Sequence, residues 1–190
     1  MIPSLNPILF FLSTLFGLQT PFVAEQMEVT IDFKENIAII KYMDLSVPYE
    51  EENKDKIADY AKLKLKEIEN STEFDSKMKG LELMSSEFEK IDGKLNVKIT
   101  FSFSNSDFLL RTLFFNYAPG KESVPIDKIY YCLLHAEELV SSNGTAKSMK
   151  AETFIEWDKD TKIIDLQLKQ KKMEEPYWGG TKSLAEYWTK

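Results

Sequence analysis

The stretch "KLNVKITFSFS", residues 94–104, is the part of the chain that most clearly predicts its own structure. Every second residue from Leu95 to Phe103 is apolar, and the residues between them are Lys, Asn, Thr or Ser. Successive side chains of a β-strand point to opposite faces, so this alternation predicts a strand with one buried face and one solvated face. The expected core of the protein therefore includes Phe101 and Phe103.

The segments next to this strand predict antiparallel neighbours. Gly93 in "KIDGK" suits a turn that needs a left-handed backbone, so residues 83–90 are expected to pair with the strand that follows. Residues 29–43 contain an alternating run, the turn sequence "KEN" and a second apolar run, which is typical of a hairpin. Another hairpin is predicted over residues 151–170, with its turn at "DKDT". The sheet is therefore expected to be mostly antiparallel.

One long amphipathic helix is predicted over residues 47–70. Acidic residues crowd its first half and lysines its second half, which suits the helix macrodipole. The apolar residues at helical spacing are Ile57, Ala61, Leu65 and Ile68. A short helix is expected within residues 104–120, and another after Ser183, a candidate cap. The predicted fold class is α+β, a mostly antiparallel sheet with the long helix packed on one face and a short C-terminal helix.

The first 24 residues differ in composition from the rest of the chain. Met1–Ala24 contains no Asp, Glu, Lys or Arg, and Ile8–Leu18 is an apolar run of the length found in signal peptides. Polar residues follow this run before it reaches the ~20 residues of a membrane-spanning helix. We therefore expect a signal peptide over residues 1–24, a single domain over residues 25–190, a periplasmic or secreted location, and no stable membrane span after processing. A retained anchor and a buried N-terminal helix are the alternatives.

The charge and the cysteine content limit the classes of partner. The formal net charge is −7, and Arg111 is the only arginine. Nucleic-acid binding depends on a basic field and leans on arginine, so no nucleic-acid partner is expected. A single cysteine cannot form an internal disulfide, so the stability of the fold is expected to come from packing.

Cys132 and His135 are the only cysteine and histidine of the chain, and they lie three residues apart in "KIYYCLLHAE". In a strand the two side chains would point to opposite faces and could not act together, whereas in a helix they would lie one turn apart. The neighbouring tyrosines favour the strand. No zinc-ligand spacing, nucleophile elbow, phosphate loop or dinucleotide motif occurs, so no catalytic, metal or cofactor-binding residue is predicted.

The function that these patterns favour is an extracytoplasmic, non-enzymatic binding or interaction protein. Its partner would be a protein or an apolar small molecule, the latter held between the helix and the sheet near Phe101, Phe103, Tyr131 and Trp157. The simpler interpretation of these aromatic residues is that they pack in the core. The alternative function is a carboxylate-dependent hydrolase, which would need two convergent carboxylates with raised pKa values.

Overall fold

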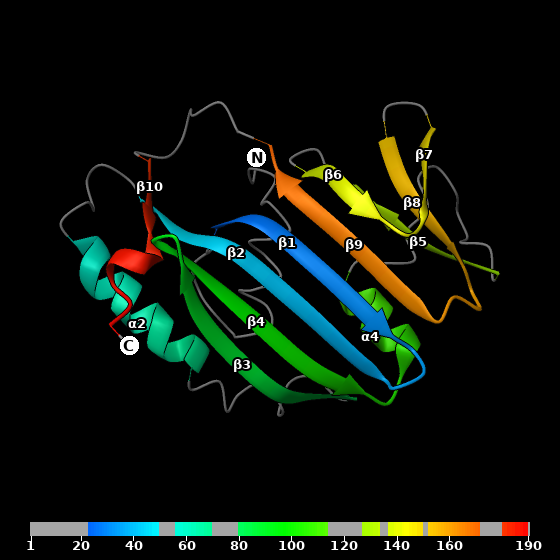
Figure 1. The fold of residues 1–190 in the computed structure, drawn as a ribbon, viewed down its shortest axis with the longest axis horizontal. Coiled ribbons are helices and arrows are strands. Elements are labelled where there is room, and N and C mark those ends of the chain that lie inside the picture. The colour runs from blue at the N-terminus through cyan, green and yellow to red at the C-terminus, as the bar shows by residue number, and fades with distance from the viewer. Residues whose placement is uncertain are drawn as a thin grey trace, which may run out of the picture.

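The fold is mostly antiparallel β and contains two sheets (Figure 1). The computed structural model describes residues 23–49, 56–69, 80–113, 127–133, 137–149, 152–171 and 180–189. Sheet A contains β1 (Val23–Asp32), β2 (Ile37–Tyr49), β3 (Leu81–Ile91), β4 (Lys94–Phe103), β6 (Glu137–Ser142), β9 (Ile163–Gln170) and β10 (Gly180–Ser183). Sheet B contains β5 (Lys128–Cys132), β7 (Thr145–Met149) and β8 (Glu152–Asp158).

Sheet A has the strand order β3-β4-β2-β1-β9-β6, and β10 pairs with the end of β2. The strand that the alternation predicted is β4, whose apolar residues from Leu95 to Phe103 are all buried. The turn between β3 and β4 has positive φ at Asp92 (50°) and at Gly93 (77°), as a tight hairpin turn requires. The predicted hairpins β1–β2 and β3–β4 are confirmed. The hairpin predicted over residues 151–170 is wrong, because its two strands, β8 and β9, belong to different sheets.

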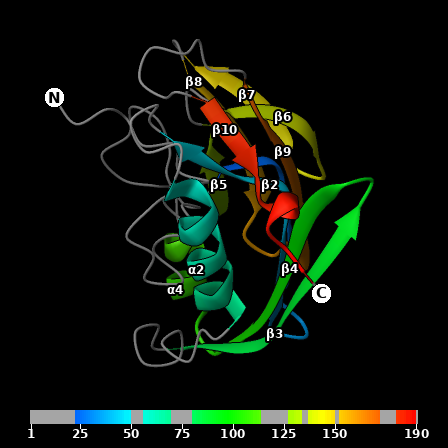
Figure 2. The same ribbon diagram turned by 90° about the vertical axis from the view of Figure 1, so that its left-hand side faces the viewer.

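The core lies on one face of sheet A, which we call the inner face. Figure 2 shows α2 (Ile57–Glu69) and α4 (Ser106–Thr112) on the same side of this sheet. Buried residues of both helices, of sheet B and of the C-terminal turn η2 (Leu184–Glu186) join the inner-face residues of sheet A in one cluster. The opposite face, the outer face, carries Lys41, Lys98 and other polar residues. The inner–outer alternation of β4 therefore extends across the sheet.

The prediction of a long amphipathic helix packed on a sheet is wrong, and with it the α+β class. Strand β2 continues to Tyr49, and Val47 and Pro48 pair with Lys182 and Thr181 of β10. Helix α2 begins only at Ile57 and has 13 residues. The charge gradient that suggested one helix from residue 47 says nothing about a strand partner more than 130 residues away in the sequence. Backbone pairing with β10 therefore decides the structure of residues 47–49.

The two other predicted helices are short. Helix α4 has seven residues and is capped by Asn105, whose side chain accepts a hydrogen bond from the Phe108 amide. The predicted C-terminal helix is the single 3-10 turn η2, capped by Ser183. No helix in the described part of the chain is long and apolar enough to cross a membrane.

The predicted domain boundary falls inside a strand. Strand β1 begins at Val23, and Ala24 is fully buried opposite Leu45 of β2. Cleavage after Ala24 would remove two residues from this strand. The new N-terminus would be Glu25, whose carboxylate forms an ion pair with Lys94. Residues 1–22 lie outside the described residues, and the signal peptide stays a prediction.

Candidate functional site

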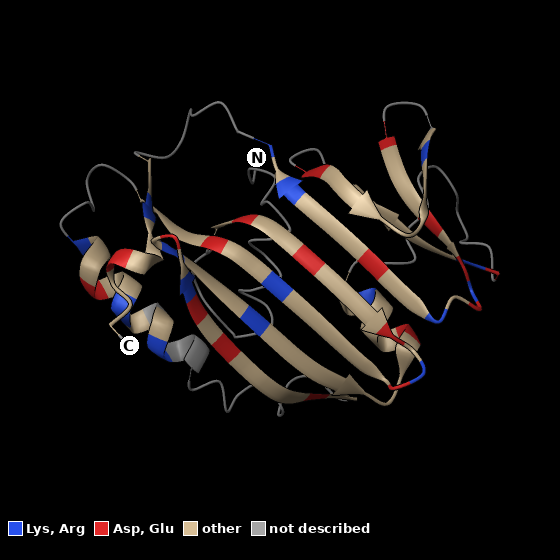
Figure 3. Ribbon diagram, viewed as in Figure 1, with Lys and Arg blue, Asp and Glu red and all other residues tan. Residues whose placement is uncertain are grey.

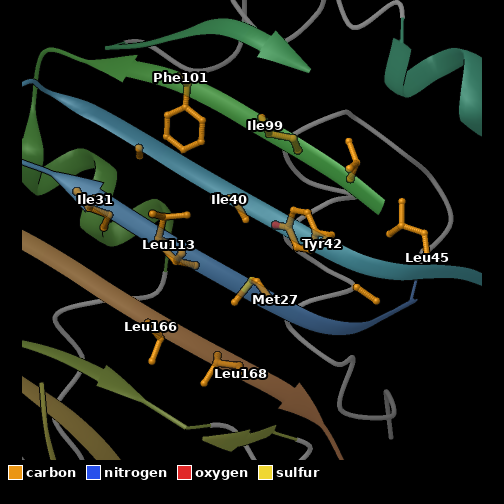
Figure 4. Packing of buried hydrophobic residues seen from close by; sticks show 14 of the residues in the cluster. Met27, Ile31, Ile40, Tyr42, Leu45, Ile99, Phe101, Leu113, Leu166 and Leu168 are labelled. Carbon is orange, nitrogen blue, oxygen red and sulfur yellow. The ribbon is translucent and has the colours of Figure 1, made fainter. Parts of the chain in front are cut away.

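The four aromatic residues proposed as ligand contacts all lie in the buried core. Phe101 and Phe103 come from β4 and are 0% and 4% exposed, and Tyr131 and Trp157 come from sheet B and are 3% and 4% exposed. Figure 4 shows Phe101 beside other core residues on the inner face of sheet A. Phe103 makes an edge-to-face contact with Phe33, with ring centroids 6.1 Å apart. All four side chains therefore have a packing role, and contact with an apolar ligand stays a prediction.

Trp157 connects sheet B to sheet A through Asn143. The indole Nε1 donates to Asn143 Oδ1 at 2.8 Å, and the same oxygen accepts from the amide of Asp165 in β9 at 3.0 Å. Asn143 Nδ2 donates to the Ile163 carbonyl at 2.9 Å. A Cβ atom at Gly144 would lie 2.5 Å from the Trp157 ring, so the close approach of the indole requires glycine there. This turn therefore fixes the position of Trp157.

The Cys132–His135 pair can be placed only in part. Residues 128–132 form strand β5, so the strand prediction is confirmed there, and Cys132 is a buried free thiol. Burial raises the pKa of this thiol, and the charges of Glu152 and Glu137 raise it further. A thiol with a raised pKa is a poor nucleophile at neutral pH. His135 lies outside the described residues.

A buried carboxyl group lies between the two sheets, and sequence reasoning missed it. Glu137 begins β6 and is 2% exposed, and the Tyr131 hydroxyl lies 3.0 and 3.1 Å from its two oxygens. Glu137 pairs with Gln170 of β9, and two residues later Leu139 pairs with Leu168, so Glu137 faces inward. The sequence signal for this burial is the two-residue spacing of Glu137 and Leu139. It indicates that Glu137 faces inward only when a strand is known to begin there.

Burial raises the pKa of the Tyr131 phenol well above its ordinary value, and the neighbouring Glu137 carboxyl group raises it further. Burial alone has the same effect on Tyr42, which lies on the inner face of β2. Tyr42 also contributes to the raised pKa of Tyr131, so these two phenols and the carboxyl group form one buried polar cluster. We call Tyr42, Tyr131 and Glu137 the buried polar cluster.

Raising the pH above about 10, the pKa of an unperturbed tyrosine, should destabilise the fold. A phenol with a raised folded-state pKa keeps its proton after the unfolded chain has lost it. The stability it contributes is thus complete below pH ~10 and falls as the pH rises toward the folded-state pKa. Tyr42 and Tyr131 should each lower the free energy of unfolding by roughly 1 kcal/mol per pH unit in that range.

Urea melts at about pH 9, 10 and 11 measure this slope. The double variant Tyr42→Phe/Tyr131→Phe has no ionisable phenol at either position, so its slope should be much smaller. Equal slopes in the wild-type protein and in the double variant would contradict the assignment.

Glu156 of the described residues does not show the raised carboxyl pKa that a hydrolase would need. Glu156 of β8 lies 2.8 Å from Lys147 and 3.7 Å from Lys128. The hydrogen bond from Lys147 lowers the pKa of Glu156, which is the opposite of what a general acid requires. No group of three Cys, His, Asp or Glu side chains in the described ranges is placed to hold a metal ion.

The outer face of sheet A carries a continuous row of polar side chains. The row crosses six neighbouring strands through directly paired residues, which are Glu87, Lys98, Lys41, Glu28, Gln167 and Ser141. In Figure 3, acidic and basic positions lie on the neighbouring strands β3, β4, β2 and β1, in the places that Figure 1 labels. We call these six residues the outer polar row.

Contacts within the outer polar row link its members across the strands. Lys41 Nζ lies 3.1 Å from Glu28 Oε2, and Lys98 Nζ lies 3.7 Å from Glu87 Oε1. Gln167 Nε2 donates to Glu28 Oε1 at 3.1 Å, and Ser141 Oγ lies at the same distance from Gln167 Oε1. The four charged side chains are 34–59% exposed, so they remain available to solvent.

No protein family, curated protein or solved structure matches this chain. The surfaces and contacts described above are therefore the basis for a functional proposal.

Proposed function

We propose that this protein is an extracytoplasmic, non-enzymatic interaction protein that binds a partner protein through the outer face of sheet A. The observation that carries the proposal is the outer polar row. It extends over six strands on the side of the sheet opposite to α2 and α4. A face of this width offers many polar groups to one partner.

The contacts within the row favour binding in energetic terms. Ordering long side chains at an interface costs about 0.5–1.5 kcal/mol for each one. Lys41 and Gln167 already contact Glu28 in the free protein, so part of this cost has been met before a partner arrives. The isolated ion pairs themselves contribute little to stability, because exposed pairs are screened by water and salt.

A carrier of an apolar ligand is the second candidate, and the buried polar cluster favours it. Ligand sites are mostly apolar with a few precisely placed polar groups, and Tyr131 and Glu137 lie within an apolar core between two sheets. In this interpretation the cluster would bind a polar end group of the ligand.

Native mass spectrometry of the protein from its own cell envelope tests both candidates. We expect a stoichiometric protein partner on the wild-type protein and about tenfold less of it on Lys41→Gln/Lys98→Gln, because both side chains lie in the centre of the face. The matched control is Lys34→Gln/Lys159→Gln, which removes the same charge from exposed turns and should retain the partner.

Three other results would contradict parts of this proposal. A co-purifying lipid without a protein partner would favour the carrier function. Equal loss of the partner in both double variants would exclude the outer polar row as the binding surface. The intact mass in the same spectra tests export, since a processed protein should begin at or near Glu25. A soluble protein that retains Met1 would contradict an extracytoplasmic location.

A further inference from the structure

The border of sheet A formed by β3 has the features of a strand-docking site. Of the strands in the described ranges, only β4 pairs with β3, so β3 is terminal in the sheet order (Figure 1). The register shifts at Met84, and the seven residues after it, 85–91, pair without interruption with residues 94–100 of β4. Alternate residues of such a strand direct their backbone N–H and C=O groups toward the side of β3 away from β4.

The two faces of segment 85–91 differ in chemistry at the border of the sheet. On the outer face, Glu87 and Glu89 are both exposed, and Lys98 is the basic partner of Glu87 at 3.7 Å. On the inner face, Phe88 stacks on Trp188 with ring centroids 4.6 Å apart. An incoming strand would therefore meet two carboxylates on one face and an aromatic surface on the other.

We propose that β3 binds an extended peptide segment of a partner protein as an additional strand. The segment would carry the pattern basic–apolar–basic, and the proposal rests on the interaction function stated above. Residues opposite each other in neighbouring strands project to the same face. Two Lys or Arg residues would lie opposite Glu87 and Glu89, and the apolar residue between them would lie opposite Phe88. Backbone hydrogen bonds would supply affinity, and the alternating side chains would supply specificity.

Self-pairing of β3 centred on its glutamates is unfavourable. Two β3 strands paired antiparallel about Glu87, Phe88 or Glu89 would place at least one glutamate directly opposite another. Like charges in direct cross-strand pairs are destabilising. In these three pairings the charge of the edge therefore favours a basic partner strand over a second copy.

Three synthetic heptapeptides with blocked ends test the proposal on the full chain. The first is Thr-Thr-Lys-Phe-Lys-Thr-Thr, and the second replaces both lysines with glutamates. The third is Thr-Lys-Thr-Phe-Thr-Lys-Thr, which has the composition of the first but places lysines and phenylalanine on one face. We expect the first peptide to bind about tenfold more tightly than either other peptide and to slow amide exchange of alternate residues within 85–91.

Charge reversal at the edge provides the matched variant. The double variant Glu87→Lys/Glu89→Lys should reverse the preference and bind the glutamate peptide more tightly. The control is Glu35→Lys/Asp160→Lys, which makes the same charge change in exposed turns and should keep the wild-type preference. Equal binding of the two lysine peptides, protection confined to other strands, or no binding would each overturn the proposal. If no peptide binds while the native partner still depends on Lys41 and Lys98, the interaction function stands and only strand docking is excluded.

Discussion

Replacing Phe101 with alanine should lower the free energy of unfolding by ~3–5 kcal/mol. Its ring is fully buried on the inner face of β4, between Ala38 of β2 and Leu83 of β3 in the sheet register. The substitution removes a large apolar surface and leaves a space that a rigid sheet cannot close completely. Urea melts should show a lower midpoint with an unchanged slope, because the folded state remains compact.

Ser102→Ala is the matched control for this substitution. Ser102 is the next residue of the same strand, and it lies on the outer face between Ile37 and Glu82. Its side chain is partly exposed, so its replacement should change the stability by only about 0.5 kcal/mol. A one-residue shift of register would exchange the two results. Equal losses would mean that a further element covers the outer face over Ser102.

The alternation along β4 could be read from the sequence because it is a local property. Side chains in a strand have a period of two, so Leu95 to Phe103 define both the strand and its buried face without reference to any partner. The same holds for the β3–β4 turn, where Asp92 and Gly93 adopt the positive φ values that the turn sequence favours.

The sheet order could not be predicted in the same way. Strand β1 pairs with β9, so Val29 lies beside Leu166 across more than a hundred residues, and no local pattern encodes that choice. The false helix prediction over residues 47–49 has the same origin, because the pairing of β2 with β10 depends on the far end of the chain. Glu137 was missed because its burial follows from the position of β6 between β9 and sheet B.

The two functional proposals depend on different parts of sheet A. The outer polar row is a face, and its charges would contact side chains of a partner. The β3 edge is a backbone surface, and it would contact the main chain of a partner. Glu87 belongs to both, since it ends the outer polar row and lies opposite the expected basic residue at the edge. A single partner could therefore occupy the edge with one strand and the face with its flanking residues.

Replacing Tyr131 with phenylalanine should lower the free energy of unfolding by about 2–3 kcal/mol, although it removes only one oxygen atom. That hydroxyl lies 3.0 and 3.1 Å from the oxygens of Glu137, which is buried where water cannot take its place. Removing the donor from a buried acceptor costs more than the net value of the bond, because the acceptor stays desolvated. Tyr187→Phe is the control, because Tyr187 is only partly buried and its replacement should change stability by about 0.5 kcal/mol or less.

The pair Tyr131→Phe and Glu137→Leu distinguishes loss of this interaction from general loss of packing. If the hydroxyl stabilises the fold by bonding the carboxyl group, Tyr131→Phe should cost less in a Glu137→Leu background, where no buried carboxyl group remains to be left without this donor. The double-mutant cycle should then give a coupling energy of about 1–3 kcal/mol. Strictly additive losses would show that the two side chains stabilise the fold independently, and the buried polar cluster would lose its basis as a linked unit. A coupling in that range would instead show that sheets A and B are held together at this point by a polar contact, so that a ligand able to compete for Glu137 would also loosen the junction between them.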